Sequence, residues 1–244
     1  MSNKILILIL STKDIRYRKF IDNCNSTWVA NARNRGIRCI FYSGGVSQDK
    51  LDNDHLELNC DDSLVGTSFK LFKALSFIEN SGIDYTHIYR TNLSSFIFLD
   101  SFINYCSSLD STFYGGVIGK FNKLIILNRF HSISVLSSKL LKFQTIEFAS
   151  GSGFFISKDL VSIVINNKAL RFSYIDDVMV GNALLGHKIT FIPRFDIAND
   201  IEKLPFEHDC YHIRLKSSDR TIDAKRLLLL NKYSNLSSFI DSQV

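Results

Sequence analysis

Two adjacent carboxylates, Asp176 and Asp177, are the side chains of this sequence whose type and placement best suit proton transfer. They stand where a helix is expected to begin, so one carboxylate can cap the helix while the other faces a ligand. A ligand-facing carboxylate on a rigid element can act as a general base. Simple capping fits the same residues, because exposed amides and the helix dipole favour acids at a helix start. On residue types alone, capping is the favoured interpretation.

Two further polar segments are candidates for ligand contact. Asn92-Leu93-Ser94 follows an expected strand, and an Asx turn would explain it without any function. Gly151-Ser152-Gly153 can bring backbone close to a substrate, or can form an ordinary tight turn. The run Asp61-Asp62-Ser63 can cap the helix that follows it.

The C-terminal part of the chain carries an uneven positive charge. Such a segment suits phosphate groups or an anionic membrane surface, and a solvated helix face is an equal alternative. From residue 212 to 232 two aspartates stand against six cationic residues, namely Arg214, Lys216, Arg220, Lys225, Arg226 and Lys232.

Composition excludes several classes of protein. The 244 residues are 45% hydrophobic with a net charge of +5, which excludes a disordered chain. The early apolar run Ile5–Leu10 is too short for a signal peptide or a membrane span, so a cytoplasmic protein is expected, with peripheral membrane contact at most. The five cysteines form no CxxC pair, so neither a zinc site nor a disulfide framework is indicated. No aromatic motif typical of RNA binding occurs, so no nucleic-acid partner is expected.

Strands and helices alternate along the first hundred residues. Strands are predicted over 4–10, 38–42, 56–60 and 85–89, with helices over 14–34 and 65–80. This order predicts an α/β fold with a mostly parallel sheet flanked by helices. Ligands of such sheets bind at the carboxyl ends of the strands, where residues 90–95 lie.

The second half of the chain is less regular. Strands are predicted over 112–118, 123–127, 149–156 and 188–192, and helices over 157–166 and 174–185. The simplest division is one domain over 1–195 and a basic C-terminal extension over 196–244, packed on the same domain.

The order of these pieces resembles the Fringe and β-1,3-galactosyltransferase group of glycosyltransferases (family 31 and its bacterial relatives) over roughly residues 5–192. That group has an arginine-rich first helix ending in Thr-Trp, a lysine-containing helix, a strand ending in an acidic triplet, a Ser-Gly-Gly-Gly-Tyr stretch and a Glu-Asp-Val-x-x-Gly motif. The similar segments here are Arg16, Arg18 and Thr27-Trp28; Lys70 and Lys73; Arg90–Phe96; Ser150–Val161; and Asp176–Gly181.

The resemblance implies a GT-A-type, Rossmann-like fold and inverting transfer from a nucleotide-sugar donor, with a UDP-sugar favoured. Asp177 would be the base, and Asp176 would cap the helix or orient the acceptor, or the two roles would be exchanged. The resemblance and the basic tail together give two sets of expected binding residues. Donor contacts are expected from Ser11, Thr12, Arg16, Lys70, Arg90, Thr91, Asn92, Ser94, His212, Arg214, Lys216 and Arg220, and acceptor contacts from Gly151, Ser152, Gly153 and Phe154.

The sequence departs from that group at the acidic triplet, which holds a divalent metal there. Its positions carry Asn92, Leu93 and Ser94 here, and neutral side chains are poor ligands for Mg²⁺ or Mn²⁺. No cofactor or metal is therefore expected, and basic side chains would stabilise the leaving diphosphate. His212 stands where the group has a C-terminal metal-binding histidine, and here it would donate a hydrogen bond to phosphate.

The resemblance and the absence of a targeting signal point to a glycan or lipid-linked glycan acceptor in bacterial surface polysaccharide synthesis, such as O-antigen or capsule. A catalytically inactive relative that binds a sugar or nucleotide, or serves as a scaffold, is the alternative. The degenerate triplet favours that alternative, and the retained pair Asp176-Asp177 argues against it.

Overall fold

The computed structural model describes residues 3–127, 140–167, 170, 172, 175–198, 210–233 and 238. These residues form an eight-stranded sheet in the order β3-β4-β2-β1-β5-β8-β7-β9 and a three-stranded sheet in the order β10-β11-β6. The strands of the large sheet are β1 (Ile5–Leu10), β2 (Arg38–Ser43), β3 (Lys50–Asp52), β4 (His55–Glu57), β5 (His87–Asn92), β7 (Tyr114–Leu127), β8 (Leu140–Ser157) and β9 (Thr190–Phe191). The small sheet contains β6 (Ser95–Ile97), β10 (Phe195–Ile197) and β11 (His212–Leu215).

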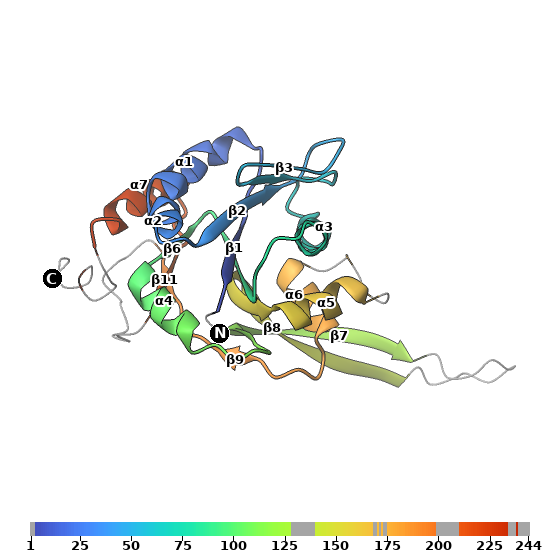
Figure 1. Ribbon diagram of the computed structural model, residues 1–244. Helices are drawn as coiled ribbons and strands as arrows, with labels where there is room; N and C mark the ends of the chain where they lie inside the picture. Colours follow the sequence, from blue (N-terminus) through green and yellow to red (C-terminus); the bar gives the residue numbers. More distant parts are fainter. Residues whose placement is uncertain are drawn as a thin grey trace, which may run out of the picture.

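Helices cover both faces of the large sheet (Figure 1). On one face lie α1 (Arg18–Ser26), α2 (Trp28–Asn34), α4 (Leu99–Ser107) and α7 (Arg220–Leu230). On the other face lie α3 (Thr67–Asn80), α5 (Lys158–Asn166) and α6 (Asp176–Ala183). A short 3₁₀ helix over Ile15–Tyr17 precedes α1.

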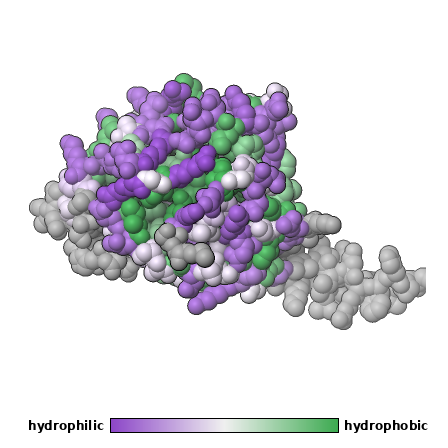
Figure 2. Space-filling model, viewed as in Figure 1, coloured by the Kyte–Doolittle hydropathy of each residue, from purple (hydrophilic) through white to green (hydrophobic). Residues whose placement is uncertain are grey.

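The central strand β1 shows why the sequence folds in this way. Its six residues are all apolar, and successive side chains of a strand point to opposite faces. Ile7 and Ile9 accordingly join the core under α1 and α2, whereas Leu6 and Leu8 join the core under α3. Figure 2 shows the outside of the same view, where hydrophilic residues dominate and hydrophobic residues appear in the hollows between them.

The predicted α/β class with a mixed, mostly parallel sheet is confirmed. β1 pairs in parallel with both β2 and β5, and β2 pairs in parallel with β4. β5 pairs with β8 in antiparallel fashion, and β8 forms a long hairpin arm with β7. The carboxyl ends of β1, β2 and β5 therefore lie together at one edge of the sheet.

Several predicted elements differ in their bounds. The helix expected over 14–34 is broken at Thr27, whose backbone (φ −117, ψ −116) is not helical. The strand expected over 56–60 is instead β4, at the end of a hairpin in which Asn53 turns the chain with φ 52. Asparagine tolerates this left-handed conformation, which allows the tight connection from β3. The two strands expected over 112–118 and 123–127 are one strand, β7, and the strand expected over 188–192 is only Thr190–Phe191.

The C-terminal part of the chain shares a sheet with the earlier part. β11 pairs with β10 in parallel and with β6 in antiparallel fashion, so residues 212–215 lie beside residues 95–97. The division expected after residue 195 falls inside β10. This pairing places the cationic residues of β11 next to the turn that follows β5.

Candidate active site

A pocket of about 510 Å³ opens at the sheet edge where β1 and β5 end. Its volume lies in the range of ordinary small-ligand pockets. We call it the β1–β5 pocket. Loops after β1 and β5, the start of α3 and the start of α7 supply its lining residues, which are Leu10, Ser11, Thr12, Asp14, Arg16, Tyr17, Asp62, Ser63, Leu64, Thr67, Lys70, Asn92, Leu93, Ser94 and Arg220.

The β1–β5 pocket brings together seven of the twelve residues expected to contact a donor. Because β1 and β5 are parallel neighbours, the residues that follow them meet at one edge. These seven are Ser11, Thr12, Arg16, Lys70, Asn92, Ser94 and Arg220, whereas Arg90, Thr91, His212, Arg214 and Lys216 are not among the lining residues. Donor binding by the seven remains a prediction.

Asp62 joins the segments that form this pocket. Its carboxylate accepts hydrogen bonds from Thr12 Oγ1 (2.7 Å), the backbone N–H of Lys13 (2.7 Å) and the backbone N–H of Gly44 (2.8 Å). It also forms an ion pair of 2.6 Å with the buried Lys70. Burial raises the pKa of Asp62, but the hydrogen bonds from Lys70 and the loop outweigh it, so the net pKa lies below the ordinary value. The sequence suggested only helix capping for this run, yet α3 begins later, at Thr67.

Arg90 and Asp176 form a buried ion pair on the same edge. The Arg90 guanidinium donates to Asp176 Oδ2, and its Nε donates to Tyr42 Oη over 3.1 Å. Both side chains are at most 10% exposed. Burial alone lowers the pKa of Arg90, but the charge of Asp176 outweighs that effect, so Arg90 stays cationic. The expected contact of Arg90 with the donor is replaced by this contact with Asp176, because the guanidinium is already engaged inside the protein.

Asp177 begins α6 beside Asp176 and is held by two backbone groups. Its Oδ2 accepts the N–H of Gly151 over 2.8 Å, and its Oδ1 accepts the N–H of Val178 over 2.8 Å. Burial and the neighbouring charge of Asp176 raise its pKa, despite the opposing effects of Gly151 and Arg90. A raised pKa makes this carboxylate a stronger base than an exposed aspartate.

The turn after β5 has the form of an Asx turn. Asn92 Oδ1 accepts from the N–H and Oγ of Ser94 (3.1 and 2.9 Å) and from Ser95 Oγ (3.2 Å). The only acceptor atom of the Asn92 side chain therefore faces the turn itself. Its amide nitrogen, which can only donate, is the remaining polar group of a side chain that lines the β1–β5 pocket.

The segment expected to contact an acceptor is largely enclosed. A Cβ on Gly151 would lie 2.8 Å from Arg90 and 3.2 Å from the carboxylates of Asp176 and Asp177, which explains the glycine by close packing. Gly153 packs in the same way against His212 and Tyr89. Phe154 is 1% exposed and packs in the core against Tyr114, so it offers no surface to a sugar.

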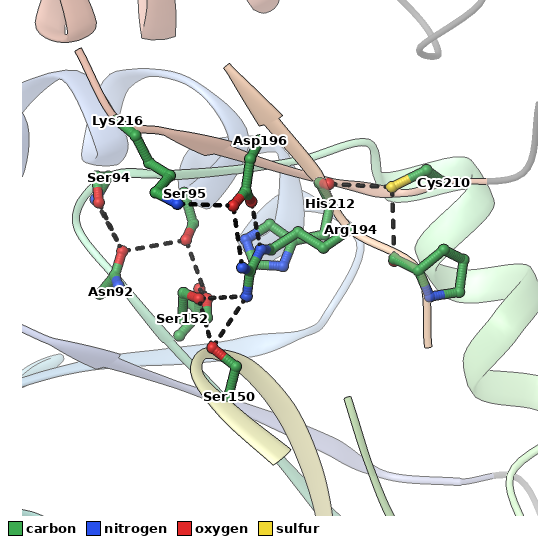
Figure 3. A network of polar contacts seen from close by, with 12 residues as sticks. Asn92, Ser94, Ser95, Ser150, Ser152, Arg194, Asp196, Cys210, His212 and Lys216 are labelled. Atoms are coloured by element: carbon green, nitrogen blue, oxygen red, sulfur yellow. Dashed lines mark hydrogen bonds and ion pairs between the residues drawn. The ribbon is translucent and has the colours of Figure 1, made fainter. Parts of the chain in front are cut away.

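Ser152 and Thr91 also serve internal contacts. The Ser152 hydroxyl is bound by Arg194, and its carbonyl accepts from Thr91 Oγ1 over 2.8 Å and from Ser95 Oγ over 3.2 Å (Figure 3). Thr91 is fully buried. The hydroxyl groups of Ser152 and Thr91 are therefore engaged in hydrogen bonds within the protein.

Three of the expected donor-binding residues, two on β11 and one directly after it, lie in different environments. His212 is 2% exposed and its Nδ1 is hydrogen-bonded to Tyr89 Oη at 2.8 Å, while its Nε2 has no partner within the described part of the chain. Burial, followed by the charge of Arg194, lowers the pKa of His212 well below its ordinary value, so the ring is neutral and enclosed. A hydrogen bond from His212 to phosphate stays a prediction. Lys216 is paired with Asp196 at 3.1 Å.

Arg214 differs from both of these residues. It is half-buried, stands opposite Ser95 in the β11–β6 pairing, and its Nε has no hydrogen-bond partner among the described residues. Burial and the charge of Arg194 lower its pKa, while Asp196 and Asp177 act in the opposite direction. Arg214 is thus an incompletely satisfied cation within electrostatic reach of Asp177.

Arg194 and Asp196 are site residues that the sequence did not single out. Arg194 Nε donates to Asp196 Oδ1 over 2.6 Å, and its Nη1 reaches Ser150 and Ser152 (Figure 3). The spacing Arg-x-Asp after Pro193 could have indicated this pair, because side chains two residues apart in extended backbone lie on the same face.

Two negative findings apply to the described residues. They contain no group of three or more His, Cys, Asp or Glu side chains placed to hold a metal ion. They also contain no helix that is both long enough and apolar enough to cross a membrane.

A ligand pocket at the carboxyl edge of a mixed α/β sheet places the chain in the class of α/β proteins that bind a ligand across the strand ends. Comparison with protein families identifies the family. The galactosyltransferase family model matches residues 25–194, which is most of the chain, so this chain belongs to the galactosyltransferase family. It is a glycosyltransferase of the hexosyltransferase type and has a sugar donor and an acceptor as substrates.

Other comparisons add less. No curated protein sequence matches this chain. Among solved structures it is similar to a glycosyltransferase involved in the glycosylation of the major capsid of PBCV-1, with 7% identity, a TM-score of 0.48, and 92% of this chain and 99% of that chain covered. It is similar also to the inositol-1-phosphate CTP transferase of T. maritima, with 10% identity, a TM-score of 0.48, and 96% and 98% covered.

Proposed function

We propose that this protein transfers a sugar from a nucleotide-sugar donor to an acceptor hydroxyl with inversion of configuration, and that Asp177 is the general base. The observation that carries the proposal is the environment of Asp177, which is buried, held by the Gly151 N–H and placed beside the Arg90–Asp176 pair. Arg90, the partner of Asp176, lies on β5 two residues before Asn92, which lines the β1–β5 pocket.

The two carboxylates have separate parts in this proposal. Asp176 is already paired with Arg90 inside the protein, which makes it the orienting member. Asp177 is bound only by backbone N–H groups in the described structure, and a raised pKa favours proton acceptance. Asp177 takes the proton of the acceptor hydroxyl, the acceptor oxygen forms a bond to the anomeric carbon, and the bond from that carbon to the donor phosphate breaks.

We infer that the leaving nucleoside diphosphate is stabilised by side chains and not by a divalent metal. A metal site needs carboxylate or carbonyl oxygens directed at the ion. The residues at the acidic-triplet positions do not fit this requirement, since Asn92 Oδ1 is occupied by Ser94 and Ser95. The donor-only amide of Asn92 suits an anion or a sugar hydroxyl instead.

Among the cations of the site, Arg214 and Arg220 are the best placed for this task. Lys70 is buried in its pair with Asp62, and Lys216 is held by Asp196. Arg214 has an Nε without a hydrogen-bond partner among the described residues. Arg220 lines the β1–β5 pocket, and its side chain is 41% exposed while its Nη1 is paired with Asp223 at 2.6 Å. Guanidinium groups bind phosphate oxygens through parallel hydrogen bonds, so two arginines can stabilise the departing charge.

The proposal also names the substrates and the pathway. The donor is a UDP-sugar, and the acceptor is a glycan or lipid-linked glycan in the assembly of a bacterial surface polysaccharide such as O-antigen or capsule. These assignments rest on the sequence resemblance. The cationic residues near the pocket are compatible with any nucleoside diphosphate.

The test is a donor screen with product analysis. UDP-, GDP-, CMP- and dTDP-sugars are incubated with the protein, with and without EDTA, and released nucleotide and transferred sugar are measured. The proposal predicts turnover of at least one donor, resistance to EDTA, and an inverted anomeric configuration in the product NMR spectrum. Loss of turnover in EDTA contradicts metal independence, and retention of configuration contradicts the role of Asp177.

A further inference from the structure

Arg194 connects two parts of the site through one planar group. Its Nη1 donates to Ser150 Oγ over 3.2 Å and to Ser152 Oγ, while Nε and Nη2 donate to the two oxygens of Asp196 over 2.6 and 3.2 Å (Figure 3). The side chain is only 8% exposed. A guanidinium bound at both of its edges has little freedom to rotate, so it fixes the distance between β8 and β10.

Ser150 and Ser152 lie on either side of Gly151, the residue whose N–H binds Asp177. The two hydroxyls lie 3.1 Å apart and both contact Arg194, whereas a Cβ on Gly151 would face Arg90, Asp176 and Asp177. Arg194 therefore holds this segment of β8 through the residues on either side of the one that contacts Asp177. A Cβ on Gly151 would lie 2.8–3.2 Å from Arg90, Asp176 and Asp177, so Gly151 packs closely against them. A shift of β8 at this point would therefore displace the two carboxylates.

The other edge of Arg194 fixes the small sheet. Asp196 stands opposite Arg214 in the β10–β11 pairing, and Lys216 also contacts Asp196. The Arg194 guanidinium thus binds both β8, which carries Gly151, and the β10–β11 pair, which carries Arg214.

We propose that Arg194 is a positioning residue that acts through Ser150, Ser152 and Gly151 to place the Asp177 carboxylate relative to Arg214. The inference rests on the proposed function of Asp177. Arg194 itself touches no reacting atom, so its removal is expected to change the rate of transfer and to leave nucleotide affinity unchanged.

The test uses a variant that keeps the ion pair. Ser150→Ala combined with Ser152→Ala removes both hydroxyl contacts but leaves Arg194 paired with Asp196, so the small sheet keeps its support. We expect kcat to fall about 10- to 100-fold, as small misplacements of catalytic groups do. The Kd for UDP, measured by calorimetry, should stay within about twofold. The Gly151 amide signal in a ¹H–¹⁵N NMR spectrum is compared between the wild type and Arg194→Gln, which leaves both sequence neighbours of Gly151 unchanged. It should move, because the hydrogen bond to Asp177 changes.

Arg194→Gln and its combination with the two serine variants complete the series. If the serines act through Arg194, the triple variant loses no more kcat than Arg194→Gln does, because neighbours on one path are not additive. Arg33→Gln is the matched control, since Arg33 is partly buried and paired with Asp54 at 2.9 Å outside the site, and it should leave kcat and the Gly151 signal unchanged.

Two results would overturn the proposal. One is an unchanged kcat in the double serine variant together with an unmoved Gly151 amide in Arg194→Gln, and the other is a triple variant whose loss is the product of the separate losses. If the wild-type protein transfers no sugar, the proposed function fails, and the Gly151 signal of Arg194→Gln alone decides: a moved signal supports positioning by Arg194, and an unmoved one overturns it.

Discussion

The backbone N–H of Gly151 donates a 2.8 Å hydrogen bond to Oδ2 of Asp177, which connects the interior of β8 to the start of α6, 26 residues later. Glycine is required there because any side chain would meet Arg90 and both carboxylates. The same contact holds Asp177 in one orientation while burial raises its pKa. Orientation and basicity of this carboxylate therefore come from the same packing.

The pH dependence of transfer should report Asp177. Its pKa is raised above 3.8, first by burial and then by the charge of Asp176, and the base must be ionised to accept a proton. We expect kcat/KM to rise with pH through an inflection above 3.8. The raised pKa also makes the stability of the fold depend on pH. The contribution of Asp177 to the free energy of unfolding is fully present below the unfolded pKa of 3.8 and is lost as pH rises through the folded pKa. An acid limb at or below 3.8 would contradict the assignment.

Breaking the buried Arg90–Asp176 pair should destabilise the fold. Arg90→Met leaves Asp176 as an unpaired buried charge, which costs about 3–5 kcal/mol in comparable cases. Arg35→Met is the control, because its pair with Asp100 is exposed at 43% and 61% and contributes at most about 1 kcal/mol. Urea unfolding measures both variants, and equal small losses would show that Arg90 is not needed to neutralise Asp176.

Asp62→Asn should weaken the loops around the β1–β5 pocket in a pH-dependent manner. The pKa of Asp62 is lowered on folding, so its contribution is present above the unfolded value of 3.8 and is lost as pH falls through the folded pKa. We expect the loss of stability to be about 2 kcal/mol near neutral pH, typical of hydrogen bonds to a charged group. Thermal unfolding across pH checks this, and a loss that does not shrink at low pH would contradict it.

Arg214→Ala and Arg220→Ala should each weaken the binding of UDP or of the donor by about tenfold, as loss of one charged hydrogen bond does. Lys225→Ala, an exposed cation on α7, is the matched control and should leave the affinity unchanged. EDTA should not alter any of these values. Variants that change only the association with anionic vesicles would favour a membrane role for the cationic segment instead.

The part of the fold that follows from local pattern was predictable. An all-apolar β1, glycine residues after the helices that end at Asn34 and Asn80, and polar residues after β5 together predict the sheet and the edge where ligands bind. β10 and β11 were not foreseen, because strands of three and four residues carry too little periodicity to distinguish them from loops.

In the site, too, local features were predictable from the sequence and tertiary contacts were not. Asp176 and Asp177 are visible as a motif, but the pairing of Asp176 with Arg90 joins residues 86 positions apart and depends on the packing of α6 against β8. The enclosure of His212 and Phe154 likewise comes from tertiary burial, which residue type does not reveal. Asn92 was correctly interpreted as an Asx turn, since that interaction spans only three residues.

The most direct test of the account is the turnover of Asp177→Asn measured beside its affinity for UDP. Removing a general base should lower kcat by about 10²- to 10⁴-fold. The Kd for UDP should be unchanged, because a general base acts on the acceptor hydroxyl and not on the nucleotide. Transfer by Asp177→Asn at the wild-type rate would contradict the assignment of Asp177 as the base.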